Sequence, residues 1–301
     1  IDMCKIVFGD DFAQNNCCTT SLINANSPLV WDETMLGALR TYARNNHAVM
    51  CSPFSMAGAS SPASNVGTMA LVTAEALMAI AYAQLVRPGA PMLFGVPAMT
   101  VALNPGAPVH GSPDSAVVQF LAGQMARRYE VPHRAIANCA TSKSADMQAG
   151  FDSVWGLFPS FLRGAEWMTM AGGMMEGTLG VGYAKTVIDF EQLDAFYHFC
   201  QGPRYDDLEE IFETIQDVGP GGHFLGTAHT RKSNLFIFPS QNNVTFEQWE
   251  AEGCRSTEQV GLAKARDWLS RYEAPPIDPT LDQALHEFIA RRESEIPKTL
   301  G

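Results

Sequence analysis

The sequence predicts an α/β fold of the TIM-type (β/α)8 barrel class. Short apolar runs alternate with helical patterns at intervals of roughly 30–45 residues, a spacing typical of parallel βα units. Long connections follow the predicted strands and short turns follow the predicted helices, as at the functional face of a barrel. A doubly wound open sheet would also alternate, but no GxGxxG follows the first predicted strand. The sequence therefore favours a barrel.

The predicted strands are short apolar runs bounded by glycine, proline or polar residues. They occupy residues 5–9, 27–31, 47–51, 91–96, 134–137 and 167–171. A complete barrel contains eight such strands. Either further strands escape this pattern, or the chain lacks the first N-terminal elements of a barrel.

The predicted helices follow residues that cap helix N-termini well. Asp32 can cap the first helix, and Ser112 or Asp114 can cap the third. The second is apolar on nearly every face, so we expect it to be buried, and Arg87-Pro88-Gly89 ends it. The predicted helices cover residues 33–45, 68–86, 115–129, 146–163, 183–199, 208–216, 258–272 and 280–295.

This pattern divides the chain into two regions. Residues 1–240 are expected to hold the (β/α) barrel domain, and residues 241–301 a C-terminal helical extension that packs on the barrel. The chain starts with Ile1-Asp2 rather than with methionine. We therefore expect a processed or truncated form of a longer protein.

Composition excludes several classes of function. The 301 residues carry a formal net charge of −12 at pH 7 and the pI is near 5.0, which argues against a nucleic-acid partner. No apolar run free of charge or proline reaches the roughly 18 residues of a membrane span, and no signal peptide is recognisable. The seven cysteines form no CxxC pair and are expected to be free thiols in a cytoplasmic protein.

Residues 219–230 form the densest cluster of unusual residue types in the chain. The cluster contains four glycines, Pro220, His223 and His229. Glycine permits positive φ angles and a close approach of the backbone to a ligand. The histidines are therefore either functional groups or polar residues that cap a turn, and this segment alone does not decide between the two.

A second candidate follows the last predicted strand. Glu176 lies in a glycine-rich loop, where its carboxylate could meet a cationic ligand; the alternative is a loop carboxylate that satisfies backbone N–H groups. Ring faces of Phe54, Phe94, Tyr183 and Phe224 could surround such a cation. Each of these rings is, by itself, more typical of a core.

Other chemistries have less support. His223 and His229 are six residues apart, and no HxxxH, HExxH or GxSxG pattern occurs. These observations disfavour a zinc site and a serine hydrolase. No metal bound to this chain is expected.

Several segments together resemble the trimethylamine methyltransferase superfamily. The most specific are Ala-Gly-Gly-Met-Met-Glu-Gly at 171–177 and Val-Gly-Pro-Gly-Gly-His-Phe-Leu-Gly-Thr-Ala-His-Thr at 218–230. Further matching segments lie at 83–91, 123–129, 246–250 and 272–279. The resemblance follows the whole chain in order, and the chain resembles the C-terminal part of a full-length member.

The resemblance implies a TIM barrel that passes a methyl group from a methylated amine to the Co(I) of a corrinoid on a separate protein. Members that use trimethylamine carry pyrrolysine in the loop that corresponds to residues 138–143, at about Cys139, where this chain has only ordinary amino acids. A tertiary amine is a poor leaving group until its nitrogen becomes tetravalent, whereas the nitrogen of a quaternary ammonium already is. The chain is therefore more similar to the glycine betaine type of member.

The resemblance thus implies a corrinoid-dependent methyltransferase of one-carbon metabolism or methanogenesis that uses a quaternary amine such as glycine betaine. The alternatives are a methyltransferase for trimethylamine or another methylated amine, and a barrel that binds quaternary amines without turnover. The expected partners are a corrinoid protein, which supplies the cobalamin-type cofactor, and a small quaternary amine. Neither nucleic acid nor membrane is expected, and a homo-oligomer is left open.

The loops and the resemblance together assign the candidate site. Glu176 is expected to attract the cation, and His223 or a glycine-loop N–H to hold a substrate carboxylate; these two residues are the predicted catalytic groups. The predicted substrate contacts are Phe94, Asn138, Cys139, Tyr183 and Phe224. The predicted corrinoid-facing positions are Gly172, Gly173, Gly221 and Gly222.

Overall fold

The main sheet consists of parallel strands that pair in chain order. The computed structural model describes residues 1–295 except 97, 105 and 234. Within this part the sheet has five strands in the order β1-β2-β4-β7-β8. Their bounds are Thr20–Ile23 (β1), Ala48–Cys51 (β2), Met92–Gly95 (β4), His133–Ile136 (β7) and Trp167–Thr169 (β8). All neighbouring pairs are parallel, and Phe94 lies beside His133.

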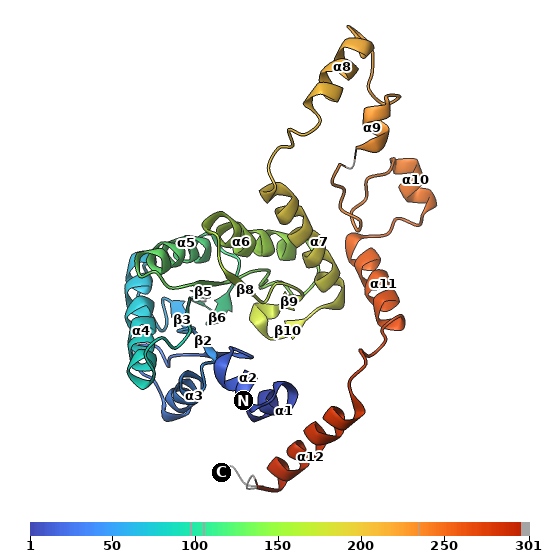
Figure 1. Ribbon diagram of the computed structural model, residues 1–301. Coiled ribbons are helices and arrows are strands. Elements are labelled where there is room, and N and C mark those ends of the chain that lie inside the picture. Colours follow the sequence, from blue (N-terminus) through green and yellow to red (C-terminus); the bar gives the residue numbers. More distant parts are fainter. Residues whose placement is uncertain (97, 105, 234, 296–301) are drawn as a thin grey trace.

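Helices connect these strands and form an arc around one face of the sheet (Figure 1). The connecting helices are α3 (Glu33–Arg44), α4 (Asn65–Val86), α5 (Pro113–Arg128) and α6 (Met147–Arg163), and α7 (Tyr183–Cys200) follows β8. Sequential parallel strands joined by helical crossovers are the arrangement found in (β/α) barrels. The curled sheet and its outer helices form an open half-barrel.

The main core lies between the sheet and its outer helices. It contains side chains from alternate strand positions and from the inward faces of α3, α4 and α5: Ile23, Val49, Cys51, Phe94, Leu39, Val72, Ala76, Val118 and Ala122. Alternate residues of a strand point to opposite faces of the sheet. The other strand positions therefore face the inside of the half-barrel.

Polar side chains cap the helices largely as the sequence predicts. Asp32 accepts a hydrogen bond of 2.8 Å from the Met35 N–H, and Ser112 accepts one of 3.1 Å from the Ser115 N–H. The predicted cap at Asp32 is thus confirmed. Of the two candidates before α5, the structure selects Ser112, because the helix begins at Pro113.

α4 is the one helix, among the residues that the structure describes, that is long and apolar enough to cross a membrane by length and composition alone. The sequence predicts no such segment because Glu75 interrupts the apolar run. Glu75 is buried and accepts hydrogen bonds from Ser27 Oγ (2.8 Å) and the Leu29 N–H (2.6 Å). Met69, Val72, Ala76 and other residues of α4 pack in the core, so core packing accounts for part of the apolar character of this helix, while Val66 and Leu85 are exposed.

The first two predicted strands are wrong. Residues 5–9 lie largely in α1 (Asp2–Phe8), an exposed helix followed by α2 (Asp10–Asn15). A short apolar run fits either secondary structure. Residues 27–31 form a turn closed by a bridge between Asn26 and Val30, with a positive φ angle at Leu29. The first strand of the sheet is instead β1, which lies outside all of the predicted strands.

Additional short strands lie within the connections that follow the main strands. After β2 and β4, a small sheet forms from β3 (Ser55–Ala57), β5 (Ala98–Ala102) and β6 (Ala107–Val109). After β8, β9 (Met174–Met175) and β10 (Gly180–Val181) form a hairpin around the 3-10 turn η1 (Glu176–Thr178). These elements gather at the C-terminal edge of the main sheet, because they follow its strands.

After α7 the chain extends away from the half-barrel, and of the later helices α11 and α12 pack against it. Helices α8 (Leu208–Val218), α9 (Ala228–Lys232) and α10 (Phe246–Ala251) project from the body as an arm, as Figure 1 shows. α11 (Thr257–Ser270) packs along α7, and α12 (Pro279–Glu295) contacts α1. A methyl group on Gly261 of α11 would lie 3.0 Å from the Ala184 carbonyl oxygen, so glycine permits this close helix contact. The division at residue 240 remains a prediction.

Candidate functional site

The candidate site is centred on residues 137–142, which follow β7 at the C-terminal edge of the sheet. The Ala137 N–H donates to the Thr169 carbonyl (3.0 Å), and the Ala140 N–H donates to the Met174 carbonyl (3.1 Å). The Gly177 N–H in turn donates to the Ala140 carbonyl (3.0 Å). The connections after β7 and β8 are thus joined by backbone hydrogen bonds and form one surface at the strand ends.

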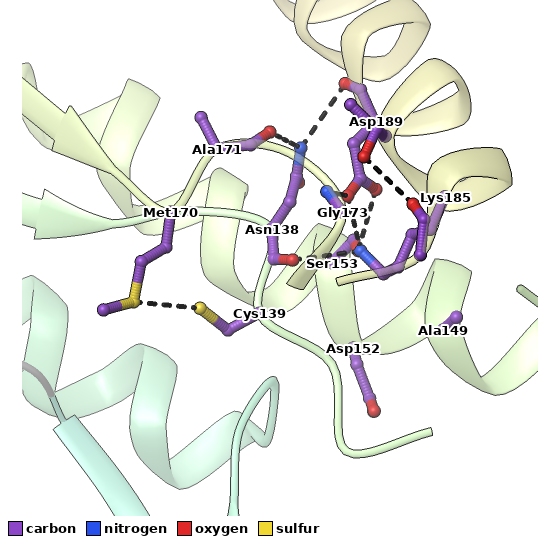
Figure 2. Close-up of polar contacts among 12 residues, drawn as sticks. Asn138, Cys139, Ala149, Asp152, Ser153, Met170, Ala171, Gly173, Lys185 and Asp189 are labelled. Carbon is purple, nitrogen blue, oxygen red and sulfur yellow. Dashed lines mark hydrogen bonds and ion pairs between the residues drawn. The ribbon is translucent and has the colours of Figure 1, made fainter. Parts of the chain in front are cut away.

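A buried ion pair on α7 holds this surface in place. Lys185 Nζ lies 2.6 Å from Asp189 Oδ2, and each side chain is only 2% exposed. The same ammonium donates to the Asn138 carbonyl (3.0 Å) and to Ser153 Oγ (2.9 Å). Asp189 also accepts a 2.7 Å bond from the Gly173 N–H. Figure 2 shows how these contacts join α6, α7 and the two loops.

The side chain of Asn138 completes this network. Its Nδ2 donates to the Ala171 carbonyl (2.7 Å), and its Oδ1 is buried without a hydrogen-bond partner among the described residues. Burial raises the pKa of Asp189, while the charge of Lys185 and three hydrogen bonds lower it. With Nζ of Lys185 making three contacts, the pair can remain ionised without water. Asn138 is therefore positioned rigidly at the strand end.

Cys139 is the second predicted substrate contact in this loop. Its thiol is 2% exposed and lies 3.7 Å from Met170 Sδ, as Figure 2 shows. Burial raises the pKa of the Cys139 thiol to about 12. At neutral pH the sulfur is thus a protonated thiol, and it is a poor nucleophile because the thiolate is the reactive form.

Glu176 lies beside this loop. It begins the 3-10 turn η1, has a φ angle of 53°, and its N–H donates to the Ser142 carbonyl (2.9 Å). Its side chain is exposed. The structure therefore brings Glu176 next to residues 138–142, with its carboxylate free to meet a cation.

A buried arginine on the inner face of the sheet belongs to the same edge. Arg134 of β7 is 1% exposed, and its Nη1 donates to Ser52 Oγ (3.1 Å) after β2. Burial lowers the pKa of Arg134 to about 10. The charge of Arg134 in turn lowers the pKa of Cys139, against the larger effect of burial.

Two predicted aromatic contacts point elsewhere. Phe94 is 0% exposed and belongs to the core between the sheet and the outer helices. Its expected contact with a ligand at the mouth is therefore incorrect for this chain. Tyr183, the first residue of α7, lines a cavity of about 260 Å³ together with Trp268 and Tyr272, on the side of α7 that faces α11. Phe54, by contrast, is partly exposed after β2.

The glycines after β8 are explained by packing against α7. A methyl group on Gly172 would lie 2.8 Å from Phe190 Cε1, and one on Gly173 would lie 2.2 Å from Thr186 Oγ1. Both distances are below normal contact. These two residues are thus needed for the approach of the loop to α7, and this replaces the expected approach to a corrinoid as the reason for glycine here.

The glycine- and histidine-rich segment lies on the arm, away from the strand ends (Figure 1). His223, Phe224, Gly221 and Gly222 occupy the exposed turn between α8 and α9. A methyl group on Gly222 would lie 2.5 Å from the Val218 carbonyl oxygen, so this glycine closes the end of α8. Within one chain, the structure does not bring these four residues to Glu176 or Cys139.

Four residues of this network were not predicted from the sequence: Arg134, Ser153, Lys185 and Asp189. A signal was present for three of them. Arg134 lies inside an otherwise apolar predicted strand, and Lys185 and Asp189 are four residues apart on a predicted helix, a spacing that brings two side chains together. Charged residues are rarely buried unless they are paired. No local pattern, however, indicates that Ser153 meets them from a different helix.

A second cavity adjoins the ion pair from outside the half-barrel. It has a volume of about 430 Å³ and is lined by residues near the N-terminal ends of α6 and α11 and by the middle of α7. Its polar lining consists of Asp146, Lys185, Asp189, Glu191, Gln192, Gln241, Ser256, Thr257 and Glu258. None of the sequence-predicted site residues lines it. Among the described residues, no three His, Cys, Asp or Glu side chains converge in a way that could hold a metal ion.

Comparison with known proteins gives a match along the chain. Residues 1–297 match the family model described as "Trimethylamine methyltransferase (MTTB)". The chain is 34% identical, over 98% of its length, to the glycine betaine methyltransferase of Desulfitobacterium hafniense strain Y51, of which it covers 62%. It is 28% identical to trimethylamine methyltransferase MttB2 of Methanosarcina mazei, and 27% to MttB of Methanosarcina barkeri, over 97% of this chain and 60% of each relative. The chain thus spans about three fifths of the length of these relatives.

Proposed function

Because the chain belongs to the trimethylamine methyltransferase family, we propose that it transfers a methyl group from a quaternary amine to the Co(I) corrinoid of a partner protein. The half-barrel is then part of a (β/α)8 barrel, with residues 1–240 in the barrel and residues 241–301 in its helical extension. The proposed compartment is the cytoplasm. The free state of all seven cysteines supports this location, because thiols stay reduced there.

The observation that carries the proposal is the buried, protonated Cys139 at the end of β7. This residue stands at about the position where the trimethylamine enzymes are expected to carry pyrrolysine. A tertiary amine becomes tetravalent only when an electrophile accepts the lone pair of its nitrogen, and a protonated thiol with a pKa of about 12 is not such an electrophile. A quaternary ammonium needs no such activation, so an inert residue at this position suits it.

The transfer itself requires no proton. The nucleophilic Co(I) attacks one methyl carbon, the C–N bond breaks with its electron pair going to nitrogen, and a neutral tertiary amine leaves. The protein then contributes chiefly by positioning the ammonium and by excluding water. The rigid loop at Asn138, fixed by Lys185 and by the Ala171 carbonyl, is suited to positioning.

Glu176 is the proposed partner of the ammonium group. Its exposed carboxylate lies beside the loop that contains Asn138 and Cys139. Phe54, partly exposed at the same edge, is a proposed ring face for the cation. Both residues can act on a ligand at the strand ends, because they follow main strands of the sheet.

His223 and Phe224 take part only if the arm of another copy of the chain reaches the strand ends. The arm exposes large apolar side chains, among them Phe212, Ile215 and Leu225, and association with another copy would cover such a surface. We therefore propose a homo-oligomer together with a role for these two residues. Light scattering at increasing protein concentration tests this part, and a protein that remains monomeric would remove His223 and Phe224 from the site.

Glycine betaine is the proposed representative of the substrate class. The relative that bears this name is 34% identical to the chain, compared with 27–28% for the named trimethylamine enzymes described above. This difference supports a quaternary amine without identifying it. Other betaines and carnitine are members of the same class.

The test uses the purified protein, Co(I) cobalamin as methyl acceptor, and a panel of glycine betaine, carnitine, choline and trimethylamine. Methylation is followed by the absorbance of the cobalamin and by mass spectrometry of the demethylated amine. Transfer from a betaine and not from trimethylamine is expected. Transfer from trimethylamine alone would contradict the proposal, and calorimetric binding of betaines without transfer would indicate a binding protein.

A matched pair of variants tests Glu176. Glu176→Gln removes the charge at the strand ends and should raise KM for the quaternary amine by roughly tenfold, the effect of about 1.4 kcal/mol. Glu130→Gln is the control. Glu130 is also an exposed glutamate with a positive φ angle, but it precedes β7 at the opposite edge of the sheet. Equal effects of the two changes would remove Glu176 from the site.

A further inference from the structure

We infer that Arg134 binds the carboxylate of a zwitterionic methylated amine at the C-terminal edge of the half-barrel. The inference rests on the proposed function and deepens it by naming the substrate class: amines that carry an anionic group, as betaines do and trimethylamine does not. It is argued from the position of Arg134, from its lack of a counter-ion, and from its surroundings.

Strand register places Arg134 inside the half-barrel. Phe94 is paired with His133, and Gly95 with Arg134. Phe94 belongs to the core on the helix side. Because strand residues alternate between faces, Gly95 and Arg134 lie on the inner face.

The side chain of Arg134 then runs along this face to the strand ends. A methyl group on Gly95 would lie 3.1 Å from Arg134 Cδ, so glycine leaves the space that the arginine occupies. Beyond Gly95, Nη1 of Arg134 reaches Ser52 Oγ at 3.1 Å. Ser52 follows β2 directly. The guanidinium therefore lies at the C-terminal edge, across β4 from its own strand.

Arg134 is a buried cation without a carboxylate partner among the described residues. In that part of the chain, no carboxylate oxygen lies within 4.0 Å of its side-chain nitrogens. Its Nη1 donates a hydrogen bond to Ser52 Oγ, and its Nε is buried without a hydrogen-bond partner among the described residues. Lys185, by contrast, is buried beside Asp189. A buried charge without a counter-ion is costly. With a pKa of about 10, Arg134 stays protonated at neutral pH, so its positive charge is not balanced by a carboxylate of the described residues.

The geometry of a guanidinium suits a carboxylate. Its N–H groups form a planar fork that can donate two parallel hydrogen bonds to the two oxygens of a carboxylate. Arg134 and Cys139 belong to β7 and to the loop that follows it directly. At the other end of the same loop, the Ser142 carbonyl accepts a hydrogen bond from the Glu176 N–H. A zwitterion at residues 138–142 would thus find a cation for its carboxylate and an anion for its ammonium group.

The experiment measures binding by calorimetry for three ligands of nearly equal shape. Glycine betaine carries both charges, its amide (carbamoylmethyl-trimethylammonium) carries the cation alone, and 3,3-dimethylbutanoate carries the carboxylate alone. The wild-type protein should bind glycine betaine roughly tenfold to a hundredfold more tightly than the amide, the range expected for one charged hydrogen-bonding partner.

Arg134→Gln should abolish this preference and the binding of 3,3-dimethylbutanoate, while affinity for the amide stays within roughly twofold. Arg128→Gln is the matched control. Arg128 is an exposed arginine at the end of α5, and its substitution should leave all three affinities unchanged. A general loss of positive charge would instead weaken carboxylate binding in both variants, and that result would overturn the inference.

The ligand panel also keeps the inference falsifiable if Arg134→Gln fails to fold. Equal affinity of the wild-type protein for glycine betaine and its amide would overturn it without any variant, as would the absence of carboxylate binding. The outcome is separable from the proposed function. Arg134-dependent binding of 3,3-dimethylbutanoate would support the inference even if no methyl transfer occurred. Methyl transfer from glycine betaine with an unchanged KM in Arg134→Gln would overturn the inference and leave the proposed function intact.

Discussion

Lys185 and Asp189 lie one turn apart on α7 and form an ion pair of 2.6 Å from which water is almost entirely excluded. Asp267 and Arg271 on α11 have the same i,i+4 spacing, but both side chains are more than half exposed. The buried pair also joins α6 and the loop after β7 through Ser153 and Asn138. The two pairs therefore differ in burial and connectivity rather than in sequence spacing.

Removal of Lys185 should strongly destabilise the protein. Lys185→Met leaves the Asp189 carboxylate buried without its counter-ion, and the free energy of unfolding should fall by about 3–5 kcal/mol. Urea denaturation monitored by circular dichroism measures this change. The double variant Lys185→Met, Asp189→Leu should recover part of the loss, because it removes the uncompensated charge.

Arg271→Met is the control for this prediction. An exposed pair contributes about 0–1 kcal/mol, so this substitution should change the free energy of unfolding by less than about 1 kcal/mol. If both single variants lost equal stability, the buried network would not be what holds the loops together.

His133 should make the protein less stable below pH 6.5. Burial is the largest cause of a pKa that is lowered from 6.5 to about 4 in the folded state; the charge of Glu166 opposes this shift, and the charges of Arg127 and Arg134 add to it. Between these values the unfolded state takes up a proton that the folded state does not, so the free energy of unfolding falls as the pH falls. Above pH 6.5 this contribution is constant.

Urea denaturation at pH 7 and pH 5 checks the contribution of His133. Between pH 7 and pH 5, His133 should lower the free energy of unfolding by at most about 2 kcal/mol, since one proton changes it by about 1.4 kcal/mol per pH unit. On acidification from pH 7 to pH 5, the His133→Asn variant should therefore lose about 2 kcal/mol less stability than the wild type. His286→Asn, at an exposed position on α12, should behave as the wild type. Equal pH dependence in all three proteins would contradict the prediction.

Substitution of Gly173 should separate packing from backbone strain. Gly173 and Gly221 both have a φ angle of 78°. A methyl group would lie 2.2 Å from Thr186 Oγ1 at Gly173, whereas nothing lies within 4 Å at Gly221. Gly221→Ala should therefore cost only the strain of the positive φ angle, about 1–2 kcal/mol, and Gly173→Ala a further 1–3 kcal/mol for overpacking. Thermal unfolding measures both, and similar losses would show that the loop after β8 is not packed against α7.

Cys139 should resist alkylation in the folded protein. Burial raises the pKa of Cys139 and of Cys51 to about 12, and reaction requires an accessible thiolate. Cys200 and Cys254 are exposed. At pH 8, iodoacetamide followed by peptide mass spectrometry should label Cys200, Cys254 and the likewise exposed Cys17 first, and Cys139 only after unfolding with urea. Rapid labelling of Cys139 would remove the basis for treating it as an inert residue at the strand end.

The fold could be predicted from the sequence wherever one element carried its own signal. Asp32 caps α3 and Ser112 caps α5, because a cap depends on residues three positions apart. The apolar character of β4 and of α4 likewise arises from local periodicity. Residues 5–9 could not be assigned in this way, since a short apolar run fits a helix as well as a strand. In the folded chain the resulting helix α1 contacts α2 and α12.

The candidate site was predictable only in part for the same reason. Glu176 was predicted because it lies among glycines after a predicted strand, whereas Asn138 and Cys139 were predicted from the loop to which the resemblance assigns pyrrolysine. Phe94 was misplaced, because its side of the sheet depends on a register that the sequence does not display. The glycine-rich segment around His223 stands out in sequence, yet it lies on an arm whose direction is set by no local pattern.

By itself, the sequence determined the family, the alternation of strands and helices, and the loop in which Asn138 and Cys139 lie. These features depend on residue types and on short spacings along the chain. Only the tertiary structure decided that Arg134 has no carboxylate beside it in the described part of the chain while Lys185 has Asp189. The physical reason is that a buried charge is defined by what surrounds it in space, and the groups around Arg134 come from strands far apart in the sequence.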